Sequence, residues 1–174
     1  MRETALLVEV PEAEPFVGGW RLRHDPVAVL GVPAHATALF PFVPPNEFVG
    51  PTLDRLCALC SDVRPFEYEL VGIDRFPEVV WLRPSPDDAF RSLTRSLVSS
   101  FSGFPPYGGR FPDPQPHLTV ARVSERAQDA FVHELSEAIG SSLPVRCVAS
   151  GLSVFTSDNG RWRRDHLLPF GPTD

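Results

Sequence analysis

The sequence predicts an α+β fold in which two similar lobes, each built from antiparallel strands and helices, face each other across a central cleft. Segments rich in β-branched and aliphatic residues alternate with segments in which apolar residues recur at helical spacing. The order strand, helix, strand, strand occurs twice, first over residues 35–83 and again over residues 117–170. The repeat predicts that the first strands of the two copies meet across the cleft.

The N-terminal half is divided by prolines and glycines, which mark the ends of its elements. Residues 11–33 have a mixed pattern, with expected turns at Gly18-Gly19 and Asp25-Pro26. The predicted elements of this half are strands over residues 4–10 and 35–42, a helix over 51–63, and strands over 66–73 and 79–83.

The C-terminal half contains the clearest helix start. Ser85 supplies a capping hydroxyl, Pro86 suits the first helical position, and Asp87 and Asp88 place negative charge in the first turn. The predicted elements are a helix over residues 86–101, a proline-rich loop over 102–116, a strand over 117–123, a helix between Ser124 and Gly140, and strands over 144–156 and 161–168 joined by the hairpin turn Asp158-Asn159-Gly160.

Composition limits the domain organisation and the class of partner. A chain of 174 residues suits one bilobed domain, 1–174, with lobes over about 27–84 and 117–170. The formal net charge is −6, and all 16 cationic side chains are arginines. Proteins that bind long nucleic acids usually carry excess positive charge, so the sequence favours a small or short substrate.

The sequence also predicts a compartment. The first apolar run carries charges, and no stretch approaches the roughly 18 apolar residues that a membrane span needs. Three cysteines do not form a disulfide framework, which favours a reducing environment. We therefore expect a cytoplasmic protein that does not associate with membranes.

Two segments share the pattern His-x-Thr-apolar, and each begins a predicted strand. They read HATA and HLTV. Side chains at positions i and i+2 of a strand point to the same face, so His35 projects with Thr37, and His117 projects with Thr119. In a helix the same positions would lie about 200° apart. The pattern therefore predicts two His–Thr pairs on strands.

Paired imidazoles suit acid–base chemistry on a phosphate ester. One ring can deprotonate a nucleophile while the other protonates the leaving oxygen, because imidazole exchanges protons near neutral pH. His35 and His117 are therefore the predicted catalytic residues, and the hydroxyls of Thr37 and Thr119 are expected to bind phosphate oxygens. The scheme requires no metal or other cofactor. The alternative is that both histidines are buried strand residues with satisfied nitrogens.

The segments HATALFPF and PHLTVAR resemble the paired signature of the two-histidine (2H) phosphoesterase superfamily, in particular its bacterial 2′-5′ RNA ligase-like branch. The flanks GVPAHATALFPF and PPYGGRFPDPQPHLTVAR agree, and the likeness runs from about residue 27 to residue 170. The resemblance implies a bilobed fold and metal-free chemistry on 2′,3′-cyclic phosphates or 2′-5′ linkages. By position it assigns catalysis to His35 and His117 and phosphate binding to Thr37 and Thr119. Ala38 stands where the family usually has a larger apolar residue, and we expect only a small effect on stability.

Four other residues near the motifs have predicted places. Tyr107 is expected either to line the mouth of the cleft or to pack within its loop. Strand alternation directs Arg122 away from His117, toward the surface or an ion pair between the lobes. Phe40 and Phe42 are expected in the core.

Cysteine and histidine spacing offers a second class of function, a thiol or metal protein. Cys57 and Cys60 form a C-x-x-C pattern, but both sulfurs continue the apolar face of the predicted helix, so core packing is the favoured interpretation. His133 and His24 are expected at the surface. A zinc site can be written from four histidines, although no spacing demands it: His24, His35, His117 and His166.

Cations and an aromatic residue alternate in the segment RWRR, a pattern also found in nucleic-acid-binding proteins. The favoured interpretation is a hairpin strand in which Trp162 packs inward. Alternation places Trp162, Arg164 and His166 on one face, so one of these cations could reach the cleft; Arg161 and Arg163 would then face solvent.

Together these features predict a monomeric cyclic phosphodiesterase or 2′-5′ RNA ligase-like enzyme. Its substrate would be the phosphate ester of a nucleotide or short RNA. The alternative from another class is a binding module that keeps the cleft and recognises a nucleotide phosphate without turnover.

Overall fold

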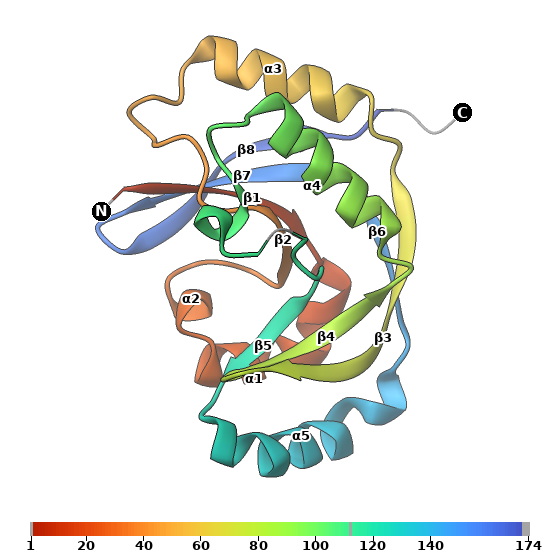
Figure 1. Ribbon diagram of the computed structural model, residues 1–174. Helices are drawn as coiled ribbons and strands as arrows, with labels where there is room; N and C mark the ends of the chain where they lie inside the picture. The colour runs from red at the N-terminus through yellow and green to blue at the C-terminus, as the bar shows by residue number, and fades with distance from the viewer. Residues whose placement is uncertain (1, 112, 172–174) are drawn as a thin grey trace.

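One sheet of eight antiparallel strands organises the computed structural model, which describes residues 2–111 and 113–171 (Figure 1). The strand order is β6-β3-β4-β5-β2-β1-β7-β8. The strands are β1 (Glu3–Glu9), β2 (His35–Leu39), β3 (Phe66–Phe76), β4 (Val79–Ser85), β5 (Leu118–Arg122), β6 (Val145–Ala149), β7 (Gly151–Asp158) and β8 (Arg161–Pro169).

Helices cover the sheet and confirm the predicted α+β class. Figure 1 shows α3 and α4 in the upper half of the view and α1, α2 and α5 in the lower half. The helices are α1 (Glu14–His24), α2 (Pro26–Val29), α3 (Gly50–Ser61), α4 (Asp88–Ser100) and α5 (Glu125–Ile139), with single 3-10 turns η1 (Pro11–Ala13), η2 (Pro106–Gly109) and η3 (Gly140–Ser142). Among the described residues, no helix combines the length and apolar character needed to cross a membrane.

Three predictions differ from the observed elements. The helix predicted to begin at Pro86, with Ser85 as its cap, begins instead at Asp88 with Asp87 at the N-cap, because Ser85 still belongs to β4. Residues 11–33, expected to be a mixed segment with turns, form η1, α1 and α2. Gly18-Gly19 lies inside α1, where packing of the helix against β5 outweighs the low helix propensity of glycine. Residues 144–156, expected to be one strand, are divided at Ser150 into β6 and β7, which lie at opposite parts of the sheet.

Strand pairing joins elements that are far apart in the sequence. The hairpin β3–β4 follows the first motif strand in sequence, but β4 pairs with β5, the second motif strand. The first motif strand, β2, pairs instead with β1, and β1 pairs with β7. The predicted order motif strand, helix, strand, strand is present twice along the chain, as β2-α3-β3-β4 and β5-α5-β6-β7, but strand pairing does not keep either copy together. The order strand, helix, motif strand, helix also occurs twice, as β1-α1-β2-α3 and β4-α4-β5-α5, with the short α2 inserted in the first copy. Sequence order alone does not say which strand edges meet.

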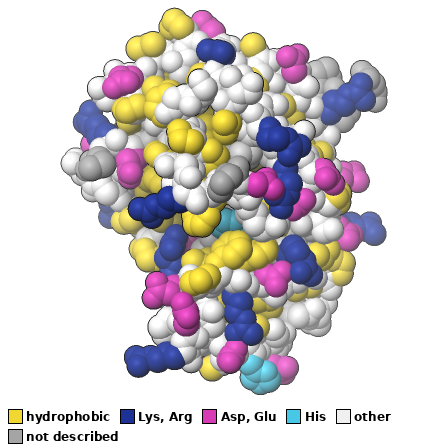
Figure 2. Space-filling view, in the orientation of Figure 1, with side chains coloured by type: hydrophobic (Ala, Val, Ile, Leu, Met, Phe, Trp, Pro, Cys, Tyr) yellow, Lys and Arg dark blue, Asp and Glu magenta, His cyan; other side chains and the backbone are white. Residues whose placement is uncertain are grey.

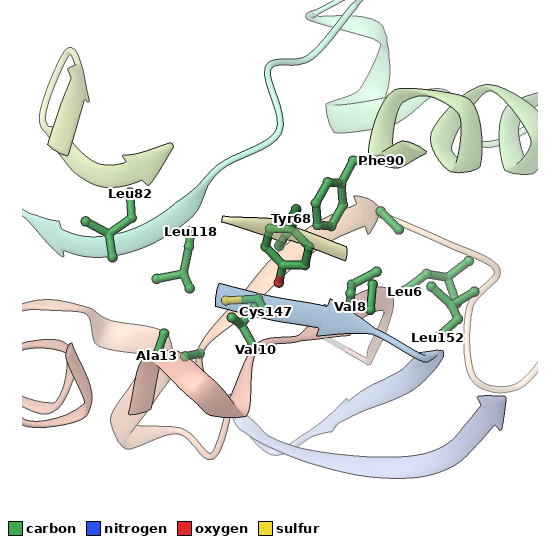
Figure 3. Close-up of a cluster of buried hydrophobic side chains, with 14 of the residues drawn as sticks. Leu6, Val8, Val10, Ala13, Tyr68, Leu82, Phe90, Leu118, Cys147 and Leu152 are labelled. Atoms are coloured by element: carbon green, nitrogen blue, oxygen red, sulfur yellow. The ribbon is translucent and has the colours of Figure 1, made fainter. Parts of the chain in front are cut away.

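The two faces of β1 serve different clusters. Leu6 and Val8 point into the main core, where Figure 3 shows them near Tyr68 and Phe90. Ala5 and Leu7 point to the opposite face, where they belong to a separate small apolar cluster with Val32 and Phe155. Since side chains alternate along a strand, one face of β1 packs into the main core and the other face packs into the second apolar cluster.

Candidate active site

The two motif strands lie side by side in the middle of the sheet. His35 begins β2 and His117 directly precedes β5. These strands pair antiparallel, with Ala36 opposite Leu118. Antiparallel neighbours are related by a local two-fold axis, so this pairing carries the His and Thr of both motifs to one face of the sheet.

All four motif side chains line one pocket of about 240 Å³. Figure 2 shows a histidine within a hollow on this face, bordered by hydrophobic side chains and surrounded by cationic ones. The other lining residues are Ala5, Leu7, Asp25, Val27, Val32, Phe40, Tyr107, Arg122 and Trp162. The structure thus brings together the residues that the two motifs predicted separately.

The two imidazole rings are anchored in the same way. Nδ1 of His35 lies 2.8 Å from the carbonyl oxygen of Pro33, and Nδ1 of His117 lies 2.7 Å from the carbonyl oxygen of Gln115. A carbonyl oxygen only accepts hydrogen bonds, so each Nδ1 carries the hydrogen. In the neutral ring this leaves Nε2 with a free lone pair, ready to accept a proton.

The surroundings favour the neutral form of both rings. Burial, followed by the nearby Arg21 charge, lowers the pKa of His35 to about 4, and the hydrogen bond to Pro33 offsets only part of this effect. Burial and the charge of Arg122 lower the pKa of His117 as well. Both histidines are therefore proton acceptors at neutral pH while the pocket holds no anion.

Each motif strand contains a β-bulge at the same motif position. On β5, Thr119 pairs with Trp81 and Ala121 pairs with Val80, so Val120 is the extra residue. On β2, Thr37 pairs with Leu7 and Leu39 pairs with Leu6, so Ala38 is the extra residue. In both cases this is the apolar fourth residue of His-x-Thr-apolar. A bulge shifts the alternation of the strand by one residue.

The bulges overturn two predictions. Strand alternation directed Arg122 away from His117, but after the bulge at Val120 it lines the same pocket, while remaining exposed as expected. No acidic side chain among the described residues forms an ion pair with it. Phe40, expected in the core, also lines the pocket because the bulge at Ala38 precedes it. Bulges leave no signal in residue composition, so alternation alone missed both residues.

Tyr107 reaches the pocket from the proline-rich loop. Its backbone has a left-handed φ of 51°, and its amide donates a 2.6 Å hydrogen bond to the carbonyl oxygen of Phe40. Its hydroxyl is hydrogen-bonded to Thr37, while burial raises the pKa of the phenol. Both places expected for Tyr107 are observed, since it lines the pocket and its ring also packs edge to face on Phe111 of the same loop, with ring centroids 5.7 Å apart.

The sequence from residue 9 to residue 161 matches the model of the 2′-5′ RNA ligase superfamily. The chain belongs to this superfamily. Among curated proteins, no sequence matches the chain.

Solved structures share the fold of this superfamily member. A crystal structure of E. coli LigT complexed with 3′-AMP is 17% identical, with a TM-score of 0.65 over 98% of this chain and 99% of that one. LigT complexed with NADP+ is 20% identical, with a TM-score of 0.60 over 98% of both chains. TT0787 of Thermus thermophilus is 16% identical, with a TM-score of 0.61 over 99% of this chain and all of that one.

One wall of the pocket is apolar. Phe40 meets Trp162 edge to face, with ring centroids 6.1 Å apart, and both belong to one apolar cluster with Val27 and Val32. The amide of Trp162 donates a 2.8 Å hydrogen bond to the carbonyl oxygen of Leu30. The pocket therefore has an aromatic wall in addition to its polar motif residues.

The other cations of the RWRR segment lie outside the pocket lining. Arg164 binds Glu9 at 2.9 Å, and Arg163 binds Asp165 at 2.7 Å. His166 stacks on Phe48, with centroids 5.9 Å apart. Alternation had grouped Arg164 and His166 with Trp162. Arg164 does share the face of Trp162, but a register shift leaves Asp165 as an extra residue after Arg164, so His166 points to the other face.

The cysteines and remaining histidines are dispersed. Cys60 is buried, which raises the pKa of its thiol to about 12, whereas Cys57 is exposed. The prediction that both sulfurs pack in the core is therefore wrong for Cys57, because α3 turns that side chain to solvent. His24 lies against Phe131, and His133 is exposed. Across residues 2–111 and 113–171, no group of three or more His, Cys, Asp or Glu side chains is placed to hold a metal ion.

Proposed function

We propose that this superfamily member is a phosphodiesterase that acts on 2′,3′-cyclic phosphates or 2′-5′ linkages of nucleotides or short RNA, without a metal. The observation that carries the proposal is the pair of equivalently anchored histidines, His35 and His117, lining one pocket with two Thr hydroxyls. Acid, base and phosphate-binding groups are thus all supplied by side chains.

In hydrolysis of a cyclic phosphate, Nε2 of one histidine accepts a proton from water as the water oxygen attacks phosphorus. The other histidine, protonated, donates its proton to the sugar oxygen as the P–O bond breaks. The roles exchange in the reverse, ligating direction, so the scheme serves hydrolysis and ligation alike.

A bound phosphate would create the protonation state that the reaction needs. Both histidines are neutral in the free pocket because burial lowers their pKa values. A phosphate anion beside them favours the charged form and raises these pKa values, so one ring takes up a proton on binding. Thr37, Thr119 and Arg122 can then stabilise negative charge on the nonbridging oxygens.

The aromatic wall supports a nucleotide as the substrate. Phe40 and Trp162 offer apolar surface for a base or ribose beside the phosphate-binding groups. The two LigT structures are complexes with nucleotides, 3′-AMP and NADP+, in a protein of the same fold. A pocket of about 240 Å³ suits one nucleotide unit better than extended RNA.

The test is a panel of 2′,3′-cyclic mononucleotides and 2′-5′ dinucleotides, assayed with the wild type, His35→Ala and His117→Ala. We expect turnover by the wild type, unchanged by EDTA, and its loss in both variants. His133→Ala removes an exposed histidine and is the matched control. Nucleotide binding by the wild type without turnover would instead identify a binding module, and loss on chelation with rescue by zinc would identify a metal enzyme.

A further inference from the structure

The carbonyl groups that anchor the two histidines belong to short segments before each motif strand. These carbonyls, of Pro33 and Gln115, fix the imidazole rings only if their own segments are held still. Neither residue lies within a regular strand or helix. What holds these segments therefore influences the orientation of both rings.

An arginine of α1 holds the first segment. Arg21 is 2% exposed and pairs with Asp25, also 2% exposed, at 2.8 Å. The same guanidinium donates to the carbonyl of Val32, adjacent to Pro33, at 3.2 Å. It also donates to the carbonyl of Thr119 in the other motif strand, at 3.1 Å. One buried cation thus links the segment that precedes His35 to the second motif strand.

An arginine of α4 holds the second segment through a side chain. Arg91 pairs with Asp87 at 3.1 Å and donates to Oε1 of Gln115 at 2.8 Å. The side-chain amide nitrogen Nε2 of Gln115 donates in turn to Asp87 at 3.0 Å. Arg91 also binds Asp113, at 2.8 Å, in the same loop. Both polar ends of the Gln115 side chain are thus occupied while its backbone carbonyl accepts from His117.

The two arrangements follow one plan on equivalent helices. α1 leads into the first motif strand and α4 into the second. Each contributes an arginine that pairs with an aspartate four residues away at one end of the helix: Asp25 directly follows α1, and Asp87 directly precedes α4. Each pair contacts the segment that precedes the motif histidine. A planar guanidinium with several donors suits this task because it can bind a carboxylate and carbonyl oxygens at once.

We propose that Arg21 with Asp25, and Arg91 with Asp87 and Gln115, are positioning residues that hold His35 and His117 with hydrogen on Nδ1 and Nε2 free. The proposal rests on the function proposed above for the two histidines. We call Arg21 with Asp25 the first clasp, and Arg91 with Asp87 and Gln115 the second clasp. The proposal predicts that disrupting a clasp changes the tautomer of its histidine and lowers the catalytic rate, while substrate binding is largely retained.

The second clasp gives the sharper test because it is only partly buried. Gln115→Ala keeps the backbone carbonyl but removes the side-chain hydrogen bonds to Arg91, Asp87 and Pro116, and Arg91→Ala removes the first of these partners. Arg91→Lys preserves the charge, and Arg95→Ala is the matched control, since Arg95 donates to Ser92 on its own helix. Asp25→Asn probes the first clasp while keeping the side-chain shape.

Histidine tautomers are read from long-range ¹H–¹⁵N spectra, with His117 assigned by its absence in His117→Ala. In the wild type and Arg95→Ala we expect the Nδ1–H form. In Gln115→Ala and Arg91→Ala we expect His117 to populate both tautomers, with His35 unchanged.

The same two variants should also be slower enzymes. On a 2′,3′-cyclic nucleotide, their kcat should fall between about 10- and 100-fold with KM little changed, and Arg91→Lys should recover part of the lost kcat. Asp25→Asn should change the tautomer of His35 in the same way.

An unchanged His117 tautomer in both Gln115→Ala and Arg91→Ala would overturn the proposal. The spectra do not depend on turnover. If the wild type hydrolyses no phosphate ester, the proposed function fails, and the tautomers still decide whether the clasps position the rings.

Discussion

The two motif strands match at their histidines, threonines and bulges but differ five residues after each histidine. The first strand leads to Phe40 and the second to Arg122, and both side chains line the pocket. The pocket is therefore symmetric where a phosphate would react and asymmetric beside it. This difference gives the pocket an aromatic side and a cationic side, which is enough to orient a substrate that has an apolar end and a charged end.

Removing either histidine tests the symmetric part and should give the largest effect. We expect His35→Ala and His117→Ala each to lower kcat by between about 10²- and 10⁴-fold, because each removes one proton transfer. Steady-state kinetics on a 2′,3′-cyclic nucleotide measure the change, with His133→Ala as control. A wild-type rate in one variant alone would break the equivalence of the two strands.

Protonation of His35 should lower the stability of the protein at low pH. The folded-state pKa of His35 is lowered to about 4, below the ordinary value of 6.5, so the unfolded chain binds the proton more readily. Its contribution is present above pH 6.5 and is lost as the pH falls toward 4, by at most about 3 kcal/mol.

Urea unfolding between pH 4 and pH 7 measures this contribution. His35→Ala should make the free energy of unfolding less dependent on pH across this range, whereas His133→Ala should retain the wild-type slope. An unchanged slope in His35→Ala would show that its ring is not desolvated in the folded protein.

Arg122→Gln tests the cationic side. Losing a charge-assisted hydrogen bond to phosphate should lower kcat/KM by between about 10- and 100-fold. The charge of Arg122 lowers the pKa of His117, so its removal should raise that pKa and move the corresponding limb of the pH profile to higher pH. Arg126→Gln, on α5, is the control. Loss of activity with no movement of the profile would place Arg122 away from His117 in solution.

Phe40→Ala tests the aromatic side and should give the smallest effect. We expect KM for a cyclic nucleotide to rise about tenfold, because stacking of a base on an aromatic ring is lost. A cyclic phosphodiester without a base should be much less affected. Equal losses on both substrates would mean that Phe40 supports the fold of the pocket and does not contact a base.

Local patterns in the sequence predicted much of the site. His35, Thr37, His117 and Thr119 were found because two residues of separation on a strand share a face, a rule that needs no knowledge of distant contacts. Phe40 and Arg122 were misplaced because the rule assumes an unbroken ladder. A bulge arises from how a strand fits its neighbours, and neither Ala38 nor Val120 differs from an ordinary strand residue.

The sequence by itself determined the α+β class, most strands and helices, and the two His–Thr pairs, because hydrophobic periodicity and turn residues act over short distances. Only the tertiary structure decided that β4 pairs with β5 and that β1 pairs with β2. It also decided that a buried Arg21 reaches both motif segments. These contacts join residues far apart in the chain, where the free energy depends on which surfaces meet and not on local residue preference.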